Sequence, residues 1–365
     1  MTEVQRWLSE PMSQEVSLAL ERLAHAPGVR RIAVMPDVHL AEHVCVGTVV
    51  ATDGVIYPQA VGGDIGCGMA TLRLHGDVDV VTQERAEQLL DALRLRVPIV
   101  RQRQRCELAP LAMSDAQLQR RVHRDACVQF GTVGRGNHFV ELQADEEGSL
   151  WLAVHSGSRA LGPAIREHHL RKADASKRVL CGLTGDAADS YLQDHDVAQD
   201  YAVRNRRAIA DAALAAIEQV LGVRGEEATW FDVTHNFVRA EQHGDANLWV
   251  HRKGACSARD GERGIIPGSM GTATYHVEGR GCAASMCSSS HGAGRRMARG
   301  EAMRRITVRG LQKDLQGVFY DHRLTDRLRD EAPSAYKDIT KVMRAQKELV
   351  RIIRRLRPVV AFKGA

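Results

Sequence analysis

Apolar residues recur at helical spacing in several stretches of the chain, and these stretches alternate with β-branched ones. Residues 13–25, 83–96 and 198–221 show the helical spacing, which predicts three amphipathic helices. The runs at 46–51 and 150–154 each lead into glycine or a turn-like cluster, which predicts strands. The pattern therefore predicts a mixed α+β fold.

Two arginine-rich stretches nearer the carboxyl end are also predicted as helices. The first, 295–316, carries Arg295, Arg296, Arg299, Arg304, Arg305, Arg309 and Lys313. The second, 339–357, places Val342, Ala345, Leu349, Ile352 and Leu356 on one side and Lys341, Arg344, Lys347, Arg351 and Arg354 on another. Charged faces of this kind are usually solvated, and the alternative is a surface for a nucleic-acid backbone.

The composition is that of a soluble globular protein, with 365 residues, 44% hydrophobic and 26% charged. This length allows one compact domain over residues 1–365. No apolar run is long enough for a membrane helix, and the amino-terminal residues do not form a basic and then apolar leader. We therefore expect a cytoplasmic protein with no membrane partner. The eight cysteines form no C-x-x-C pair, so most are expected to be reduced and buried.

Six short segments gather nucleophilic or metal-ligating residues among glycines and turns. They are MPDVH (35–39), GGDIGCGM (62–69), GTVGRGNHFVE (131–141), AVHSGSR (153–159), DVTHN (232–236) and SSSHGAGR (288–295). Side chains in such segments can converge on a ligand, because the segments are not committed to one amphipathic face.

The residue types in these segments are typical of a catalytic metal centre. Asp64 and Cys67 are three residues apart in a glycine-flanked turn, so both can reach one ion. With His138, His155 and His235 they form a set sufficient for one open site, or for two metal ions sharing the thiolate. Thiolate and imidazole suit Zn²⁺, whereas open positions for phosphate oxygens suit Mn²⁺, so the residues alone leave the ion undecided.

His291 is the candidate nucleophile. The chain contains no G-x-x-x-x-G-K-[ST] loop, no strand-linked G-x-G-x-x-G and no K-x-D-G segment. A neutral imidazole flanked by Ser288–Ser290 and Gly292–Gly294 can attack phosphorus directly. The glycines allow backbone N–H groups to approach a phosphate closely, and PGSMG (267–271) offers a second loop of this kind.

Taken in order, these segments resemble those of the RtcB family of RNA ligases. The likeness runs from about Met35 to the carboxyl terminus and includes HSGSR, VHRKGA (250–255), IIPGSMGTA (265–273), HGAGR (291–295), DEAPSAYKD (330–338) and FKG (362–364). It implies an α+β fold with a deep pocket. It also implies an enzyme that joins RNA 3′-phosphate or 2′,3′-cyclic phosphate ends to 5′-hydroxyl ends, using GTP and two Mn²⁺ ions.

The resemblance implies a role for each matching residue. Asp64, Cys67 and His138 would hold one Mn²⁺, and Cys67, His155 and His235 the second, while His291 would become guanylylated. The guanylate pocket would be lined by Asn137, His138, Phe139, Val140, Glu141, His235, Asn236, Pro267, Gly268, Ser269, Met270, Thr274, His291, Gly292, Ala293, Gly294 and Lys363. Asp37, His39 and Arg159 would bind RNA ends or support the site.

The chain departs from the family pattern without losing a metal ligand or the nucleophile. Leu40–Val46 replaces a glycine- and proline-containing loop, Ala160 replaces a glycine, and Thr274 replaces a serine. These changes bear on the substrate, which is an RNA in repair or in tRNA splicing, and on partners, an archease-like activator or a release-factor-like protein. Two alternatives are a metal-dependent phosphoesterase or nuclease and a non-catalytic RNA- or release-factor-binding module, of which neither requires His291 as a nucleophile.

Overall fold

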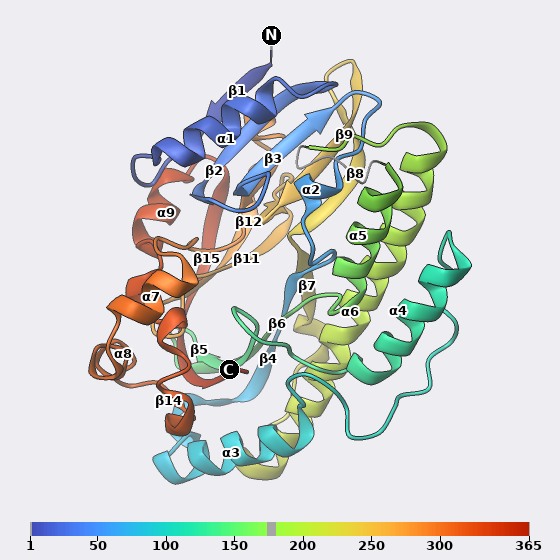
Figure 1. The fold of residues 1–365 in the computed structure, drawn as a ribbon. Coiled ribbons are helices and arrows are strands. Elements are labelled where there is room, and N and C mark those ends of the chain that lie inside the picture. Colours follow the sequence, from blue (N-terminus) through green and yellow to red (C-terminus); the bar gives the residue numbers. More distant parts are fainter. Residues whose placement is uncertain (1, 174–179, 365) are drawn as a thin grey trace.

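The computed structural model describes residues 2–173 and 180–364, and its ribbon is drawn in Figure 1. Two sheets form the centre of the molecule, and helices cover their outer faces. The predicted mixed α+β fold is confirmed. Of the helices in the described part of the chain, none combines the length and apolarity needed to cross a lipid bilayer.

The larger sheet curls into a nearly closed barrel. Its strands follow the order β11 (Arg263–Pro267), β12 (Thr274–Gly279), β15 (Val350–Phe362), β5 (Phe139–Ala144), β6 (Ser149–Ser156), β4 (Gly68–Asp77) and β7 (Phe231–Thr234), and the short β14 (Phe319–Tyr320) pairs with β15. Neighbours along this order are antiparallel, and the end strands β11 and β7 contact each other. Met69, Phe139, Ala153, Val233 and Ile265 pack together as one buried cluster contributed by five of these strands.

The smaller sheet is built mainly from the first part of the chain. Its order is β1 (Glu3–Arg6), β2 (Val29–His39), β3 (Val46–Thr52), β9 (Ala246–Lys253) and β8 (Asn236–His243), with only β1 and β2 parallel. The helix α1 (Gln14–Ala24) packs on β2, and Ser13 Oγ caps its amino end by accepting from the Val16 amide. A short pair, β10 (Ala255–Ser257) and β13 (Ser288–Ser290), lies beside this sheet and leads into His291.

Most of the longer helices lie along one side of the barrel, on the right in Figure 1. They are α4 (Ala116–Gln129), α5 (Leu161–Ala173) and α6 (Gly185–Leu221), while α3 (Gln83–Arg96) crosses below and contacts α6. Shorter helices are α2 (Pro58–Val61), α7 (Arg299–Arg305), α8 (Val308–Asp314) and α9 (Ile339–Ala345). Single 3₁₀ turns are η1 (Val78–Val80), η2 (Glu227–Thr229), η3 (Ala283–Ser285), η4 (His322–Leu324), η5 (Arg329–Glu331) and η6 (Pro333–Ala335).

The predicted helices at 13–25 and 83–96 and the predicted strands at 46–51 and 150–154 are confirmed. The helix expected from residue 198 begins at Gly185 instead. The first half of this helix was not predicted because Asp194 and His195 interrupt the apolar spacing, although both side chains are fully buried. Asp194 is satisfied there by His169 at 2.7 Å and by the Ser114 amide at 2.6 Å, so these polar positions face the protein.

Both arginine-rich helix predictions require correction. Residues 295–316 contain two short helices, α7 and α8, and residues 295–298 lie outside both. Thr307 caps the second helix by accepting from the Gly310 amide. The prediction of one helix over 339–357 is wrong beyond Ala345. From Val350 the chain is strand β15, in which β-branched residues pair with β12, and Ile352 and Ile353 are about half exposed (50% and 51%).

Candidate active site

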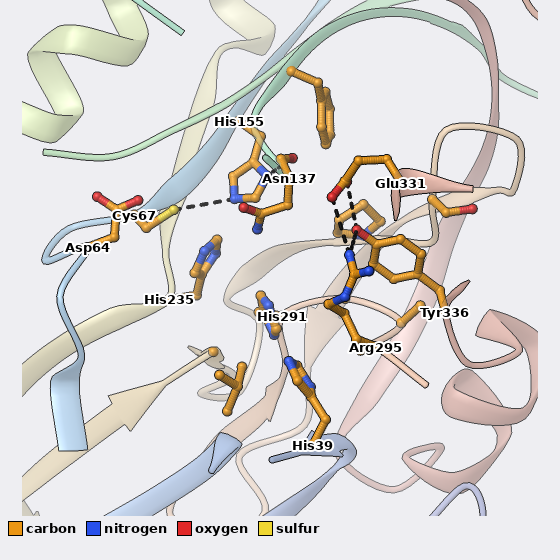
Figure 2. Close-up of a pocket in the computed structure, with 18 of the residues that line it drawn as sticks. His39, Asp64, Cys67, Asn137, His155, His235, His291, Arg295, Glu331 and Tyr336 are labelled. Atoms are coloured by element: carbon orange, nitrogen blue, oxygen red, sulfur yellow. Dashed lines mark hydrogen bonds and ion pairs between the residues drawn. The ribbon is translucent and has the colours of Figure 1, made fainter. Parts of the chain in front are cut away.

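A cavity of about 360 Å³ lies where the two sheets meet, and Figure 2 shows the side chains that line it. All six short segments that the sequence analysis singled out contribute to its wall. Predicted site residues lining it are His39, Asp64, Cys67, Asn137, Phe139, Glu141, His155, His235, Asn236, Pro267, Gly268, Ser269, Met270, His291, Gly292, Ala293, Gly294 and Lys363. Segments far apart in the sequence therefore converge on one space.

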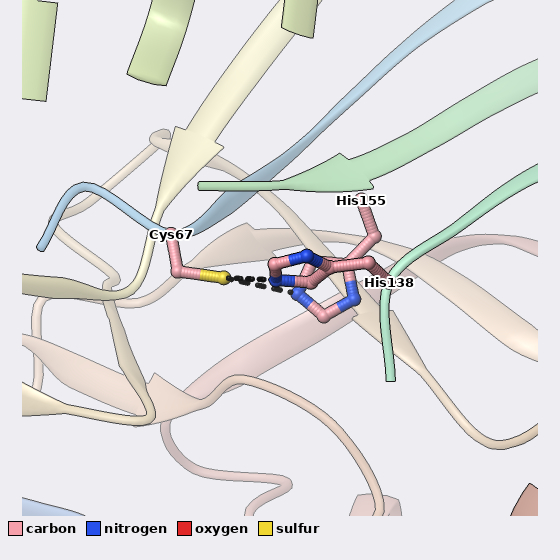
Figure 3. Close-up of side chains that lie close together, drawn as sticks. All are labelled: Cys67, His138 and His155. Atoms are coloured by element: carbon pink, nitrogen blue, oxygen red, sulfur yellow. Dashed lines mark hydrogen bonds between the residues drawn. The ribbon is translucent and has the colours of Figure 1, made fainter. Parts of the chain in front are cut away.

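Cys67 and two histidines form the tightest group of possible metal ligands (Figure 3). The Cys67 Sγ atom lies 3.4 Å from His138 Nε2 and 3.4 Å from His155 Nε2. The ligand atoms of these three residues all lie within 4.8 Å of one another, and all three side chains are buried. Strand register explains the position of His155, because it is opposite Met69 on β4 and Phe139 on β5. Cys67 and His138 immediately precede those two strands.

Asp64 extends this group. Its Oδ2 atom lies 3.0 Å from His138 Nε2, while its Oδ1 atom is buried without a hydrogen-bond partner in the described structure. The carboxyl group fills the space beside Gly157, where a Cβ atom would lie only 2.2 Å from Oδ1. The glycine in HSGSR is therefore required for Asp64 to reach the site.

His235 links the metal-type group to His291. Its ring centroid lies 5.2 Å from that of His155 and 4.8 Å from that of His291. Figure 2 shows Cys67, His235, His291 and His39 following one another across the cavity. The backbone amide of His235 donates to the Cys67 carbonyl at 2.8 Å, which fixes the two segments against each other.

Hydrogen bonds fix the histidine tautomers in a form that suits metal ligation. His138 Nδ1 lies 3.0 Å from the Val133 carbonyl, and His155 Nδ1 lies 3.1 Å from the Asn137 carbonyl. A carbonyl only accepts, so each Nδ1 donates its proton. His155 Nε2 then presents a lone pair toward Cys67, while His138 Nε2 faces both Asp64 Oδ2 and Cys67 Sγ and would offer its lone pair to a bound ion once its proton is lost. Burial also holds the pKa of His155 well below its ordinary value, which keeps that ring neutral.

The charges around the thiol favour a bound cation. Burial, and then the charge of Asp64, raise the pKa of the Cys67 thiol well above its ordinary value. Burial opposes ionisation of Asp64 as well, but the hydrogen bond from His138 and nearby positive charge leave its pKa lowered. An unpaired carboxylate oxygen, a buried thiol and neutral imidazoles together fit a divalent transition metal, which would stabilise the thiolate.

His291 is held from behind by Asp37. Its Nδ1 atom donates to Asp37 Oδ2 at 2.6 Å, and its backbone amide donates to the same oxygen at 3.3 Å. Because the carboxylate only accepts, the ring proton resides on Nδ1 and Nε2 carries the free lone pair. Gly254 has a φ of +61°, and a Cβ atom there would lie 2.9 Å from His291 Cε1. His39 lies on the same strand as Asp37, and burial lowers its pKa to about 4.

The far end of the cavity contains a buried ionic cluster around Glu331 that the sequence analysis did not identify. Glu331 binds Arg295 at 3.2 Å, Arg299 at 2.6 Å, Tyr336 at 2.7 Å and Lys363 at 3.0 Å. These partners outweigh the desolvation of Glu331 and lower its pKa to about 2. Glu331 and Tyr336 lie in the segment DEAPSAYKD, which was the available signal for this cluster.

Several predicted site residues support the cavity without lining it. Asp37 lies behind His291, and Arg159 Nη1 lies 3.3 Å from His138 Nδ1. His138 itself faces Cys67 and Asp64. Val140 points to the opposite face of β5 from its neighbours and packs into a hydrophobic core. Thr274 is buried on β12, and its hydroxyl accepts a hydrogen bond from Gln143.

Known proteins are similar to this chain over most of its length. The family model described as "tRNA-splicing ligase RtcB" matches residues 19–116 and 101–364. An RNA-splicing ligase RtcB of Escherichia coli (strain K12) is 36% identical over 97% of this chain and 95% of its own length. The chain belongs to the RtcB family. Other RtcB relatives are the RNA-splicing ligase RtcB2 of Escherichia coli (strain ATCC 25922) and the tRNA-splicing ligase RtcB of Thermococcus kodakarensis. RtcB2 is 32% identical over 96% of this chain and 93% of its own length. The Thermococcus kodakarensis protein is 28% identical over 98% of this chain and 93% of its own length.

Proposed function

We propose that this chain is an RNA ligase that joins a 3′-phosphate or 2′,3′-cyclic phosphate end to a 5′-hydroxyl end, using GTP and Mn²⁺. Membership of a family whose relatives are named RNA-splicing ligases supports RNA ligation in repair or tRNA splicing. The observation that carries the detailed proposal is the His291 ring. Its Nδ1 donates to Asp37, and its ring centroid lies 4.8 Å from that of His235. His235 in turn lies next to the Cys67 group. A nucleophile beside a metal-type centre suits nucleotidyl transfer.

Three displacements at phosphorus make up the proposed reaction. His291 Nε2 attacks the α-phosphorus of GTP, so that an N–P bond forms, the α–β P–O bond breaks and pyrophosphate leaves. An oxygen of the RNA 3′-phosphate then attacks the same phosphorus and releases Nε2. Finally the 5′-hydroxyl attacks the RNA 3′-phosphate, loses its proton and expels GMP. A cyclic phosphate end is first opened by water to a 3′-phosphate.

Five residues of the chain are proposed to hold the metal ions. Asp64, Cys67 and His138 would bind one, and Cys67, His155 and His235 the other, with the thiolate shared. Bound ions would supply positive charge to the phosphate oxygens during each displacement. Asp37 keeps the proton on His291 Nδ1, so the lone pair of Nε2 is available for the first attack on phosphorus. Mn²⁺ is the ion that the family resemblance implies.

The guanylate is proposed to lie between His291 and Glu141. A carboxylate repels a phosphate, so Glu141 suits the base end of the nucleotide and not its phosphate end. The glycine-containing loops 267–270 and 292–294 line the cavity close to His291, where backbone N–H groups suit phosphate oxygens. The segment 137–141 and Lys363 complete the wall on the base side.

Openings beside the cavity suit the RNA backbone. One is bordered by His39, Arg295, Arg296, Arg299 and Lys337, and another by Arg135, Asn137, Arg299 and Arg327. Both share residues with the central cavity, and arginine binds phosphodiesters well. We also propose that residues 1–365 act as one catalytic domain in the cytoplasm. An archease-like activator or a release-factor-like partner stays a prediction.

Covalent labelling tests the function. Incubation with Mn²⁺ and GTP radiolabelled in the α-phosphate should leave label on the denatured protein. The label should survive alkali and disappear in mild acid, because protonated imidazole is a good leaving group. His291→Ala should lose the label, yet should still join RNA whose 3′ end already carries guanylate. A phosphoesterase or a non-catalytic module would retain no label, and label persisting in His291→Ala would refute the proposed nucleophile.

A further inference from the structure

Glu141 is held by a side chain that does not itself line the cavity. Gln143 Nε2 donates to Glu141 Oε2 at 2.8 Å and to Thr274 Oγ1 at 3.0 Å. All three side chains are buried, and only Glu141 reaches the cavity wall. Because residues two apart on a strand point to the same face, Glu141 and Gln143 both face the inside of the barrel from β5. Thr274 meets them there from β12.

The orientation of the Gln143 amide is fixed by its partners. The amide nitrogen faces Glu141, which is the orientation that an ionised carboxylate requires because it only accepts hydrogen bonds. Both protons of that nitrogen are then used, one on Glu141 and the other on Thr274. The Oε1 atom of Gln143 is buried without a partner in the described part of the chain. Rotating the amide by 180° would therefore put its nitrogen where no acceptor is present, and both existing hydrogen bonds would be lost.

Gln143 is also the one hydrogen-bond donor to Glu141 among the described residues. Lys363, the cation whose charge acts on Glu141, directs its ammonium to Glu331 at 3.0 Å instead. Burial consequently raises the pKa of Glu141 to about 7. A carboxylate in this situation depends on its single donor both for its orientation and for its ability to accept further hydrogen bonds.

We propose that Gln143 is a positioning residue that determines nucleotide specificity, with Thr274 anchoring it from the neighbouring strand. By fixing the Glu141 carboxylate, Gln143 aims it at the edge of the base. Guanine presents two adjacent donors, N1–H and the N2 amino group, which match a carboxylate. Hypoxanthine keeps only N1–H, and adenine presents a bare N1 acceptor at that position. This inference rests on the proposed guanylylation. It adds Gln143 to the selection of the nucleotide and gives Thr274 an indirect part in it, through Gln143.

Steady-state ligation of RNA by the full-length protein tests the assignment, with GTP, ITP or ATP as the nucleotide. In Gln143→Met, KM for GTP should rise about tenfold while kcat changes little, because a hydrogen bond that orients the base contact is lost. The preference for GTP over ITP should fall by about the same factor. Thr274→Val should shift both quantities in the same direction and Thr274→Ser should restore them.

Thr71→Val is the matched control. Thr71 is a buried threonine on β4 of the same sheet, and it donates to the Leu152 carbonyl at 2.8 Å, away from the cavity. It should leave the GTP to ITP preference unchanged. A fall in kcat alone, or an unchanged preference in both Gln143→Met and Thr274→Val, would overturn the assignment. If Gln143→Met does not fold, the Thr274 pair decides. Absence of label on the wild-type protein with every nucleotide would instead refute the proposed function.

Discussion

The ammonium of Lys363 donates to a carboxylate oxygen of Glu331 at 3.0 Å, and both side chains are almost wholly buried. Lys363 follows β15, whereas Glu331 ends η5. The sequence motif places Lys363 in the nucleotide pocket, but the structure shows that its charge is already paired. Glu331 therefore holds Lys363 and two arginines in place at the wall of the cavity.

Replacing Glu331 with glutamine should destabilise the protein by about 3 kcal/mol at pH 7, because it leaves buried cations without their carboxylate. The pKa of Glu331 is about 2 in the folded protein and 4.5 ordinarily. A lowered pKa means that this stabilisation is complete above pH 4.5 and is lost as the pH falls toward 2. Urea unfolding at pH 7 and at lower pH should show the difference between wild type and variant shrinking. Glu147→Gln, at an exposed position, is the control.

Asp37→Asn should slow guanylylation by about 10² to 10⁴-fold while the protein stays folded. An amide can donate toward Nδ1 and so favours the tautomer in which Nε2 carries the proton and cannot attack. Single-turnover labelling measures the effect. Asp53→Asn, which removes an exposed carboxylate paired with Arg30, should label at the wild-type rate. Equal rates for Asp37→Asn and wild type would show that the tautomer is set by something else.

Cys67→Ser should lose metal binding, because a hydroxyl replaces the thiolate that both proposed ion positions share. Metal analysis of protein equilibrated with Mn²⁺ should show a loss of both ions and not of one. Cys256→Ser is a suitable control, since Cys256 on β10 is also buried but lies outside the ligand group. Retention of one ion in Cys67→Ser would argue against a bridging role.

Arg135→Ala and Arg327→Ala should each weaken binding of RNA ends. Both residues are exposed beside the cavity, and neither forms an ion pair with another described residue. Each substitution should reduce the slope of log affinity against log salt by about 0.7, the value for one phosphate contact on a single strand. Arg309→Ala, exposed on α8, should leave the slope unchanged. If the slope of log affinity against log salt is the same in all three variants, the RNA backbone does not contact the opening that Arg135 and Arg327 border.

The candidate site was more predictable than the fold around it. Cys67, His155 and His291 stand out because thiols and imidazoles among glycines suggest chemistry whatever the strand order. Helices such as α1 were also predictable, since one amphipathic face decides them locally. The segment 339–357 was not, because the apolar spacing of Leu349 and Ile352 fits a helix, and pairing with β12 decides in favour of a strand. Glu331 was missed for a related reason, since its four partners come together only through the tertiary fold.

The position of β15 between β12 and β5 has a consequence for how the protein folds. Leu356 pairs with Thr274, and Phe362 pairs with Val140, so one strand joins two parts of the barrel that are distant in sequence. Such pairings return no energy until long loops have closed. The side chains proposed to bind the metal ions are therefore expected to reach their native positions late and together during refolding. A kinetic measurement would register this as a slow phase in which native metal affinity appears at the same rate as the barrel.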